Sequence, residues 1–312
     1  MDPNILSLFS NIPDRAYARE GRCMCEGRLV IEKALQNGVE LEALLCSEER
    51  RAEYEALCRA YAGGEGKQCE RPVPVIGLPH AEIEKLVGFD FHRGALAAAR
   101  RPQLLAPPLA VSVDTAAADT LRGSALVLWQ VSDPDNLGTL IRSASALGAG
   151  SVILGPGSAD PYSRKALRTS MGCAFSMRLW AVRGAEELAA CAASSGASLS
   201  AACPVRDESA KPLANIAPGK DATSTSSSSS SDRIPRQSKL RAEQVFTEGA
   251  PHVSIAPDAI LRPLWLLLGN EGWGLPDEVL GQVRYRIAIP MHNKTDSLNV
   301  AAAGAILMYE LF

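Results

Sequence analysis

The chain has 312 residues, a hydrophobic fraction of 46% and a formal net charge of −3 at neutral pH. This length and composition allow two domains with their own cores, whereas the slight acidity argues against a protein that binds nucleic acid by its overall charge. The 8 cysteines lack the spacing of a disulfide framework or a zinc site, which favours reduced thiols in a cytoplasmic protein without a metal. No apolar stretch is long and uncharged enough for a membrane span.

The first 101 residues are predicted to form a small α/β domain, because short apolar runs alternate with helical patterns along them. Strands are expected at 22–25, 41–46, 73–76 and 94–99, and helices around 30–35, at 48–61 and after residue 79. Prolines then mark residues 102–120 as a linker.

Basic residues form local clusters in both halves of the chain. The candidates for RNA contacts are Arg22 and Arg93 in the first half, and Arg164, Lys165 and Arg168 in the second. Such clusters are the electrostatic footprint of a nucleic-acid-binding face. Scattered charge is equally the ordinary property of a solvated surface, so their sharing one face is a prediction.

The first motif follows an uninterrupted apolar run at 125–131, which is typical of a strand covered on both faces. Asn136 is expected to cap the helix that comes next, and Gly148 to close it. Arg142 lies off the apolar stripe of this helix, about one turn above Gly138, where a cation suits a polyanion or a developing oxyanion. A surface arginine on an ordinary helix has the same pattern, so this motif alone leaves both interpretations open.

Residues from about 205 to 262 are rich in serine, threonine, proline and glycine, and include a serine tract at 226–231. Such a composition cannot bury enough apolar surface to order itself. We therefore expect a disordered insertion here.

The second motif is the glycine-rich segment 269–274, which follows another buried-strand run at 264–268. Its glycines permit positive φ angles and close approach of the backbone to a ligand. The lysine and hydroxyl residue of a phosphate loop are missing, and the glycine spacing differs from the dinucleotide-binding fingerprint. A Rossmann oxidoreductase is therefore not supported.

The third motif joins Ile289-Pro290-Met291 to Ser297-Leu298-Asn299, just before the C-terminal helix that is expected from about Val300. Apolar Ile306, Leu307 and Leu311 indicate that this helix is packed. Because a strand end, a polar loop and a helix start lie so close together in the sequence, this motif predicts a ligand-binding site.

In chain order, N-x-G-x-x-x-R, L-L-L-G-N-E-G-x-G-L-P and I-P-M followed by S-L-N-V-A-x-A resemble the motifs of the SpoU/TrmH family of the SPOUT superfamily. Its members are S-adenosylmethionine-dependent RNA ribose 2′-O-methyltransferases. The resemblance covers 125–196 and 264–312, and it implies an α/β domain at 121–312 whose C-terminal segment forms a trefoil knot. The first domain resembles the substrate-binding domain of the ribosomal-RNA members.

The resemblance also implies roles for individual residues. Arg142 is implied as the catalytic residue aided by Asn136, and the site is completed by Glu271, Ser297 and Asn299. The implied S-adenosylmethionine contacts are Gly269, Asn270, Gly274, Ile289, Met291, Ser297 and Leu298. A guanidinium holds its proton beyond pH ~12, so Arg142 is better suited to orient a phosphate and stabilise an oxyanion than to act as a base.

Family members are homodimers, and the small-residue face of the last helix, with Ala301, Ala305 and Met308, is expected to pack against a partner. The first domain favours ribosomal RNA as the substrate, with transfer RNA as the alternative. A non-catalytic RNA-binding or ribosome-assembly factor of the same fold is the other class to be weighed.

Overall fold

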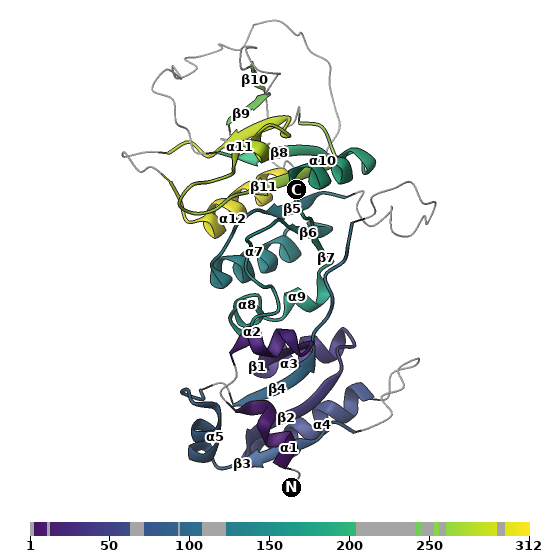
Figure 1. Ribbon diagram of the computed structural model, residues 1–312, viewed down its shortest axis with the longest axis vertical. Helices are drawn as coiled ribbons and strands as arrows, with labels where there is room; N and C mark the ends of the chain where they lie inside the picture. Colours follow the sequence, from purple (N-terminus) through teal and green to yellow (C-terminus); the bar gives the residue numbers. More distant parts are fainter. Residues whose placement is uncertain are drawn as a thin grey trace, which may run out of the picture.

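The computed structural model describes residues 3–10, 13–62, 72–92, 94–107, 123–203, 241–244, 253–255, 260–291 and 297–312. Two α/β units follow each other along the long axis of the molecule, with the N-terminal unit at one end and the C-terminal unit at the other (Figure 1). Arg93 and most of the predicted linker lie outside the described residues.

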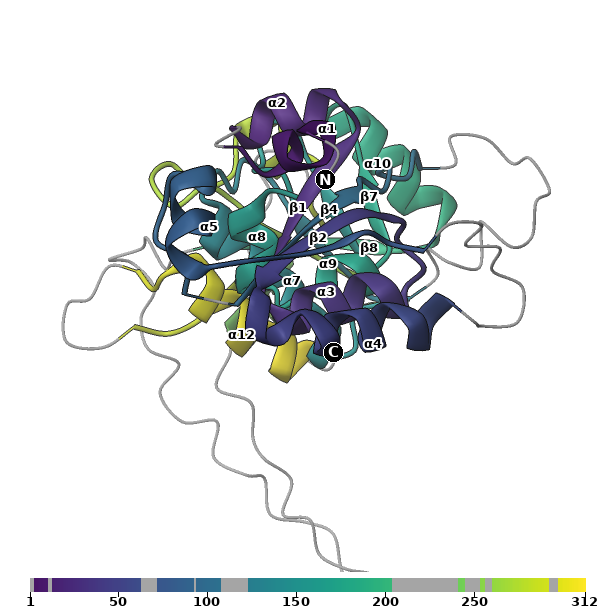
Figure 2. The same ribbon diagram turned by 90° about the horizontal axis from the view of Figure 1, so that it is seen from below.

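The N-terminal unit is built on a four-stranded sheet of order β1-β4-β2-β3. One face of the sheet packs on α3 and α4, and the other on α2 and α5 (Figure 2). The elements are α1 (Pro3–Leu6), η1 (Ser7–Phe9), α2 (Asp14–Arg19), β1 (Arg22–Glu26), α3 (Arg28–Gln36), β2 (Leu41–Ser47), η2 (Glu48–Arg50), α4 (Arg51–Ala62), β3 (Val75–Leu78), α5 (His80–Val87) and β4 (Ala95–Arg100). The predicted alternation of strands and helices is confirmed, with β3 displaced by two residues from its expected start.

The C-terminal unit is built on a sheet of order β10-β9-β12-β8-β11-β5-β6-β7, in which the strands from β12 to β7 are parallel. The elements are β5 (Ala125–Leu128), α7 (Pro134–Ala146), β6 (Ser151–Leu154), α8 (Arg164–Thr169), α9 (Cys173–Ser176), β7 (Leu179–Ala181), α10 (Ala185–Ser194), β8 (Ser198–Ala202), β9 (Arg241–Gln244), β10 (Val253–Ile255), β11 (Leu264–Leu268), α11 (Asp277–Leu280), β12 (Tyr285–Ala288) and α12 (Val300–Leu311).

Helices cover both faces of this parallel sheet. Every residue of β5 and β11 is buried, which explains the uninterrupted apolar runs. One face packs on α7, α8 and α12, and the other on α10 and α11 (Figure 1). Because the strands are parallel, the segments that leave β5, β11 and β12 emerge at the same edge of the sheet, where ligands bind in open α/β sheets.

The structure differs from the expected disorder of 205–262 in one respect. Within that segment β9 pairs antiparallel with β12, and β10 pairs with β9. The free edge of β12 would otherwise expose unpaired backbone groups, and a short strand satisfies them whatever its side-chain composition. The serine tract lies outside the described residues.

The C-terminal helix α12 packs on α7 and β11 through its small residues. A Cβ added to Gly304 would lie 2.4 Å from Leu140 Cδ2 and 2.7 Å from Leu268 Cδ1. Ala301 and Met308 are also buried, so most of the face expected to meet a partner instead faces the core of its own chain. The outward face carries Ile306 and Tyr309. The trefoil knot stays a prediction.

The two units contact each other directly through α8 and α9, which lie beside β1 and α3 (Figure 1). Arg164 and Arg168 of α8 lie 3.9 and 3.7 Å from the carboxylate of Glu26 at the end of β1. Arg101, after β4, pairs with Asp160 at 2.5 Å. We call these contacts the domain interface. None of the described helices is both long and apolar enough to span a membrane.

Candidate active site at the edge of the sheet

Side chains from all three predicted motifs meet in one chain of hydrogen bonds. Asn136 Nδ2 donates to Glu271 Oε1 at 2.7 Å, and Asn299 Nδ2 donates to Asn136 Oδ1 at 3.0 Å. Asn136 is 135 residues from Glu271 and 163 from Asn299 in the sequence. We call this set the amide–carboxylate chain. Its geometry brings together three of the residues that the sequence assigned to one site.

The expectation that Asn136 caps the helix is wrong. The cap of α7 is Asp133, whose side chain accepts from the backbone N–H of Asp135 at 3.1 Å, and Pro134 is the first helical residue. Aspartate followed by proline is a favoured helix start, because proline has no N–H to satisfy and its φ is already helical. The side chain of Asn136 is therefore free to contact Glu271 and Asn299.

Asn299 has two structural tasks. Its Oδ1 accepts from the backbone N–H groups of Ala301 and Ala302 at 2.9 and 3.3 Å, which makes it the N-cap of α12. Its Nδ2 is then directed at Asn136. Because the cap fixes the orientation of the amide, α12 positions the third motif against the first.

The glycine-rich turn after β11 is closed by its own backbone. Asn270 N–H donates to Gly274 O at 3.0 Å, and Gly274 N–H donates to Asn270 O at 2.9 Å. A Cβ on Gly269 would lie 2.4 Å from the carbonyl carbon of Gly274, and Gly274 itself has a φ of +75°. These two glycines are required by the turn itself.

Asn270 is buried and organises this turn. Its Nδ2 donates to Gln130 O at 2.9 Å, and its Oδ1 accepts from Gly272 N–H at 2.8 Å. The side chain that the sequence offered as a cofactor contact is thus already engaged, which leaves the backbone of the turn as the part that can contact a ligand. The turn is tied in this way to the segment after β5.

Arg142 is exposed on α7, as its position off the apolar stripe predicted. Within the described residues its side chain has no hydrogen-bond or ion-pair partner, so the positive charge is available to an anion. Gly138, one turn earlier, is required by the packing of two helices. A Cβ there would lie 2.0 Å from Thr169 Oγ1 and 2.6 Å from Ala166 O, so the glycine lets α7 and α8 pack closely.

The described residues between β12 and α12 include apolar side chains that are partly open to solvent. Ile289 and Met291 are half-buried, whereas Ser297 and Leu298 are exposed, with 38% of Leu298 accessible. Partly exposed apolar side chains beside a glycine-rich backbone suit a flat ring with polar edges, and adenosine is such a group. The residues present therefore fit S-adenosylmethionine. The loop 292–296 lies outside the described residues.

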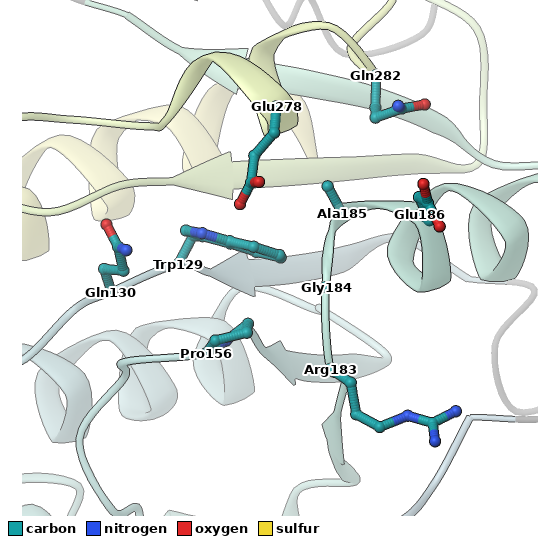
Figure 3. A pocket seen from close by; sticks show the side chains of 9 residues that line it. All are labelled: Trp129, Gln130, Pro156, Arg183, Gly184, Ala185, Glu186, Glu278 and Gln282. Atoms are coloured by element: carbon teal, nitrogen blue, oxygen red, sulfur yellow. The ribbon is translucent and has the colours of Figure 1, made fainter.

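A pocket of about 590 Å³ lies beside α10 and α11, which cover the opposite face of the sheet from α7 and α12 (Figure 3). It is lined by Trp129, Gln130, Pro156, Arg183, Gly184, Ala185, Glu186, Glu278 and Gln282. The ring of Trp129 packs on Gly155, where a Cβ would lie 2.3 Å from Trp129 Cε3. None of the predicted site residues lines this pocket, although its Gln130 contacts the turn.

The predicted RNA-binding residues that the structure describes have carboxylate neighbours. Arg22 pairs with Glu42 at 2.8 Å, and Lys165 pairs with Asp135 at 2.9 Å. The hydrogen bond to Asp135 raises the pKa of Lys165, which keeps the ammonium charged through the neutral range. Arg164 and Arg168 belong to the domain interface, and RNA contact by these residues stays a prediction.

Two residues of this region were not found from the sequence. Asp133 had a recognisable signal, since it precedes Pro134 at a helix start. Gln130 had none: its φ of +56° is unusual for a residue with a side chain, and only the structure reveals it. Among the described residues no group of His, Cys, Asp and Glu is arranged to hold a metal ion.

Comparison with known proteins adds independent information. The profile of the SpoU rRNA Methylase family matches residues 123–309. An uncharacterised tRNA/rRNA methyltransferase of Mycobacterium bovis is 30% identical over 296 residues, which cover 92% of this chain and 79% of that protein. A 23S rRNA guanosine 2′-O-methyltransferase of Bacillus subtilis is 29% identical over 192 residues, covering 60% of this chain and 56% of that protein.

Solved structures with the same fold span nearly the whole chain. An RNA 2′-O ribose methyltransferase aligns with a TM-score of 0.64 at 24% identity, covering 99% of this chain and 95% of that one. An AdoMet-bound rRNA methyltransferase from Sinorhizobium meliloti aligns with a TM-score of 0.65 at 21% identity, covering 99% and 94%. At these identities the likeness establishes the α/β fold.

Proposed function

The chain belongs to the SpoU rRNA methylase family, and from this premise we propose that it transfers a methyl group from S-adenosylmethionine to a ribose 2′-hydroxyl of RNA. The observation that carries the proposal is the amide–carboxylate chain, in which Asn136, Glu271 and Asn299 join the three motifs. A fold retained only for binding RNA would not need this polar convergence, nor an arginine on the same helix that has no partner in the part of the chain that the structure describes.

The proposed cofactor site consists of the turn after β11 and the segments after β12. Backbone groups at Gly269 and Gly274 would contact the polar edges of S-adenosylmethionine, and Ile289, Met291 and Leu298 its apolar surfaces. The exposed apolar area of Leu298 and the closed turn support this assignment. A trefoil knot, with the C-terminal segment passed through a loop, is proposed to hold these loops together.

The chain must position and deprotonate a weak nucleophile. S-Adenosylmethionine, when bound, supplies a methyl group that its sulfonium already activates. A ribose hydroxyl at neutral pH becomes a good nucleophile only as its proton leaves. Arg142 would hold a phosphate of the target nucleotide and stabilise the negative charge that develops on the ribose oxygen, since its guanidinium stays protonated. The proton would then leave to phosphate or water.

The amide–carboxylate chain would fix the geometry of this step. Asn136 lies at the start of α7 and Arg142 six residues later, about 9 Å along the helix axis. A helix held at its N-terminus by Glu271 and Asn299 keeps its later residues in a constant position. Ser297 precedes Asn299 on the same segment and would complete the site.

Ribosomal RNA is the proposed substrate, and transfer RNA is the alternative. The support is the Bacillus subtilis relative, which is named as a 23S rRNA enzyme, while other relatives are named for either RNA. The N-terminal unit is proposed to bind the RNA, together with basic residues on α8. Lys165 is the most exposed of these on α8, with 45% of its side chain accessible. A cytoplasmic location accords with such a substrate.

A homodimer is also proposed, through a different part of α12 from the one expected. The outward face of this helix exposes 41% of Ile306 and 63% of Tyr309. Large apolar residues exposed side by side on a helix are typical of an interface. Sedimentation of the chain as a monomer at micromolar concentration would contradict this proposal.

The test of the function is transfer of labelled methyl from S-adenosylmethionine to ribosomal RNA. RNA from cells that lack this gene should accept label, whereas RNA from cells that contain it should not. The label should appear in dinucleotides that resist alkali, because alkaline cleavage requires a free 2′-hydroxyl. Label in alkali-sensitive mononucleotides would indicate base methylation, and no label would contradict an enzyme.

A further inference from the structure

Trp273 is the most exposed large hydrophobic residue among those that the structure describes. Its accessible fraction is 73%, whereas the chain's other tryptophans, Trp129, Trp180 and Trp265, are at 1%, 5% and 0%. A single exposed apolar residue is ordinary on a protein surface, so the case for Trp273 depends on how its ring is held and on where it lies.

The ring of Trp273 is held in place by Gln130. Its Nε1 donates to Gln130 Oε1 at 3.1 Å, while the backbone carbonyl of Gln130 accepts from Asn270 Nδ2 at 2.9 Å. One residue therefore fixes the glycine-rich turn through both its backbone and its side chain. Gln130 does this with a φ of +56°, a conformation that costs free energy in a non-glycine residue and persists only where the surroundings impose it.

Trp273 also lies at the rim of the candidate active site. It is two residues from Glu271, whose carboxylate is part of the amide–carboxylate chain. In the sheet order β12-β8-β11-β5, however, its anchor Gln130 follows β5, on the opposite side of β11 from β12. Among the proposed cofactor contacts, Ile289 directly follows β12. Trp273 is thus close in sequence to Glu271 of the amide–carboxylate chain, and its ring is anchored on the far side of β11 from Ile289.

We propose that Trp273 is a stacking platform for a nucleobase of the RNA next to the target nucleotide, with Gln130 as its positioning residue. The inference rests on the proposed function and deepens it. An indole fixed at one edge by a hydrogen bond loses little entropy when a base stacks on it, and every base has a face that can stack. The platform would hold the strand while Arg142 acts on the neighbouring ribose.

Substitution of Trp273 tests this directly, with ribosomal RNA from cells lacking the gene as the substrate. Trp273→Ala should raise the KM for RNA by about 5- to 100-fold, the effect of losing one stacked base, with kcat within about threefold of the original. Trp273→Phe should restore most of the loss. Gln130→Ala should raise the KM for RNA by a smaller factor. Gln130→Glu keeps a side-chain oxygen that can accept from Trp273 Nε1, so its KM should stay near that of the original chain. Leu261→Ala, which removes an exposed apolar residue before β11, serves as the control and should change neither constant.

Fluorescence identifies what covers the ring. Because the other tryptophans are buried, acrylamide quenching of the intact chain reports mainly on Trp273. Ribosomal RNA should protect the fluorescence, and S-adenosylhomocysteine alone should not. Protection by S-adenosylhomocysteine would assign Trp273 to the cofactor site, and a change in sedimentation of Trp273→Ala would assign it to a subunit interface; either result overturns the inference.

The two proposals fail in different ways. If the unaltered chain methylates RNA and Trp273→Ala has an unchanged KM, the platform does not exist but the enzyme does. If the unaltered chain transfers no methyl group to any RNA, the proposed function is wrong and the inference falls with it.

Discussion

Two polar regions of this molecule differ in how their charges are satisfied. At the domain interface, Glu26 is buried and lies near both Arg164 and Arg168, and the guanidinium of Arg164 is 3.9 Å from the centre of the Phe89 ring. At the edge of the sheet, the amide–carboxylate chain is exposed and Arg142 has no partner among the described residues.

The difference shows which arginines are available for chemistry. Both regions unite residues that are distant in the sequence. At the domain interface the charges are neutralised within the chain, so they stabilise the packing of two units. At the sheet edge, Arg142 has no partner among the described residues, so its charge is available to an anion such as an RNA phosphate.

The largest expected effect is at Arg142. Arg142→Ala should lower kcat for RNA methylation by about 10²- to 10³-fold, because one donor aimed at a developing oxyanion is removed. The affinity for S-adenosylhomocysteine, measured by calorimetry, should stay within about twofold. Arg178→Ala, at another exposed arginine, is the matched control and should retain full activity. Equal losses of turnover and of cofactor affinity would make Arg142 structural and remove the contrast between the two regions.

The second effect distinguishes the role of Asn136 in the site from the role of Asp133 as the helix cap. Asn136→Ala should lower kcat by roughly 10²-fold, since a small misplacement of α7 is costly for catalysis, and should change the free energy of unfolding little. Asp133→Ala should do the reverse: it should lose about 1 kcal/mol of stability with the loss of the cap, and retain most activity. Urea unfolding and steady-state kinetics on both variants provide the check. A stability loss in Asn136→Ala as large as that of Asp133→Ala would contradict the assignment.

The third effect belongs to the domain interface. Glu26→Ala leaves two arginines without their buried carboxylate and should reduce the free energy of unfolding by about 1–3 kcal/mol, less than a fully buried pair would cost because the arginines are partly exposed. Glu55→Ala breaks the exposed pair with Arg51 and should lose only about 0.3–0.5 kcal/mol. Equal losses in thermal unfolding would show that burial at Glu26 has no energetic consequence.

The smallest effect is expected at Lys165. Lys165 on α8 lies between the two regions, paired with Asp135 yet 45% exposed. Lys165→Ala should weaken RNA binding a few-fold and reduce the slope of log K against log salt by about one, as for a single phosphate contact. An unchanged slope would indicate that Lys165 contacts no phosphate and serves only to pair with Asp135.

Much of the fold could be predicted from local signals. The apolar runs of β5 and β11 identify buried parallel strands, and the apolar positions of α12 identify a packed C-terminal helix. The meeting of Asn136, Glu271 and Asn299 was expected from the resemblance to the family motifs. The sequence does not by itself state which side chains are bonded there.

What could not be predicted depends on tertiary choices. Asp133 could have been recognised as the cap because it precedes Pro134, but the contact of Asn136 with Glu271 depends on how the turn after β11 packs. Pairing of β9 with β12 is decided by a free sheet edge far away in the sequence. The contacts of Arg164 and Arg168 with Glu26 could not be predicted either, because the sequence of a helix does not show which carboxylate of another domain will pack against it.

The most direct test of the central claim, that the three motifs form one cofactor and catalytic site, is a crystal structure of the chain with S-adenosylhomocysteine. We expect the ligand to lie against Gly269 and Leu298, with its sulfur on the side of Arg142. Ligand bound instead in the pocket lined by Trp129 and Gln282, with the loops after β11 and β12 empty, would contradict it.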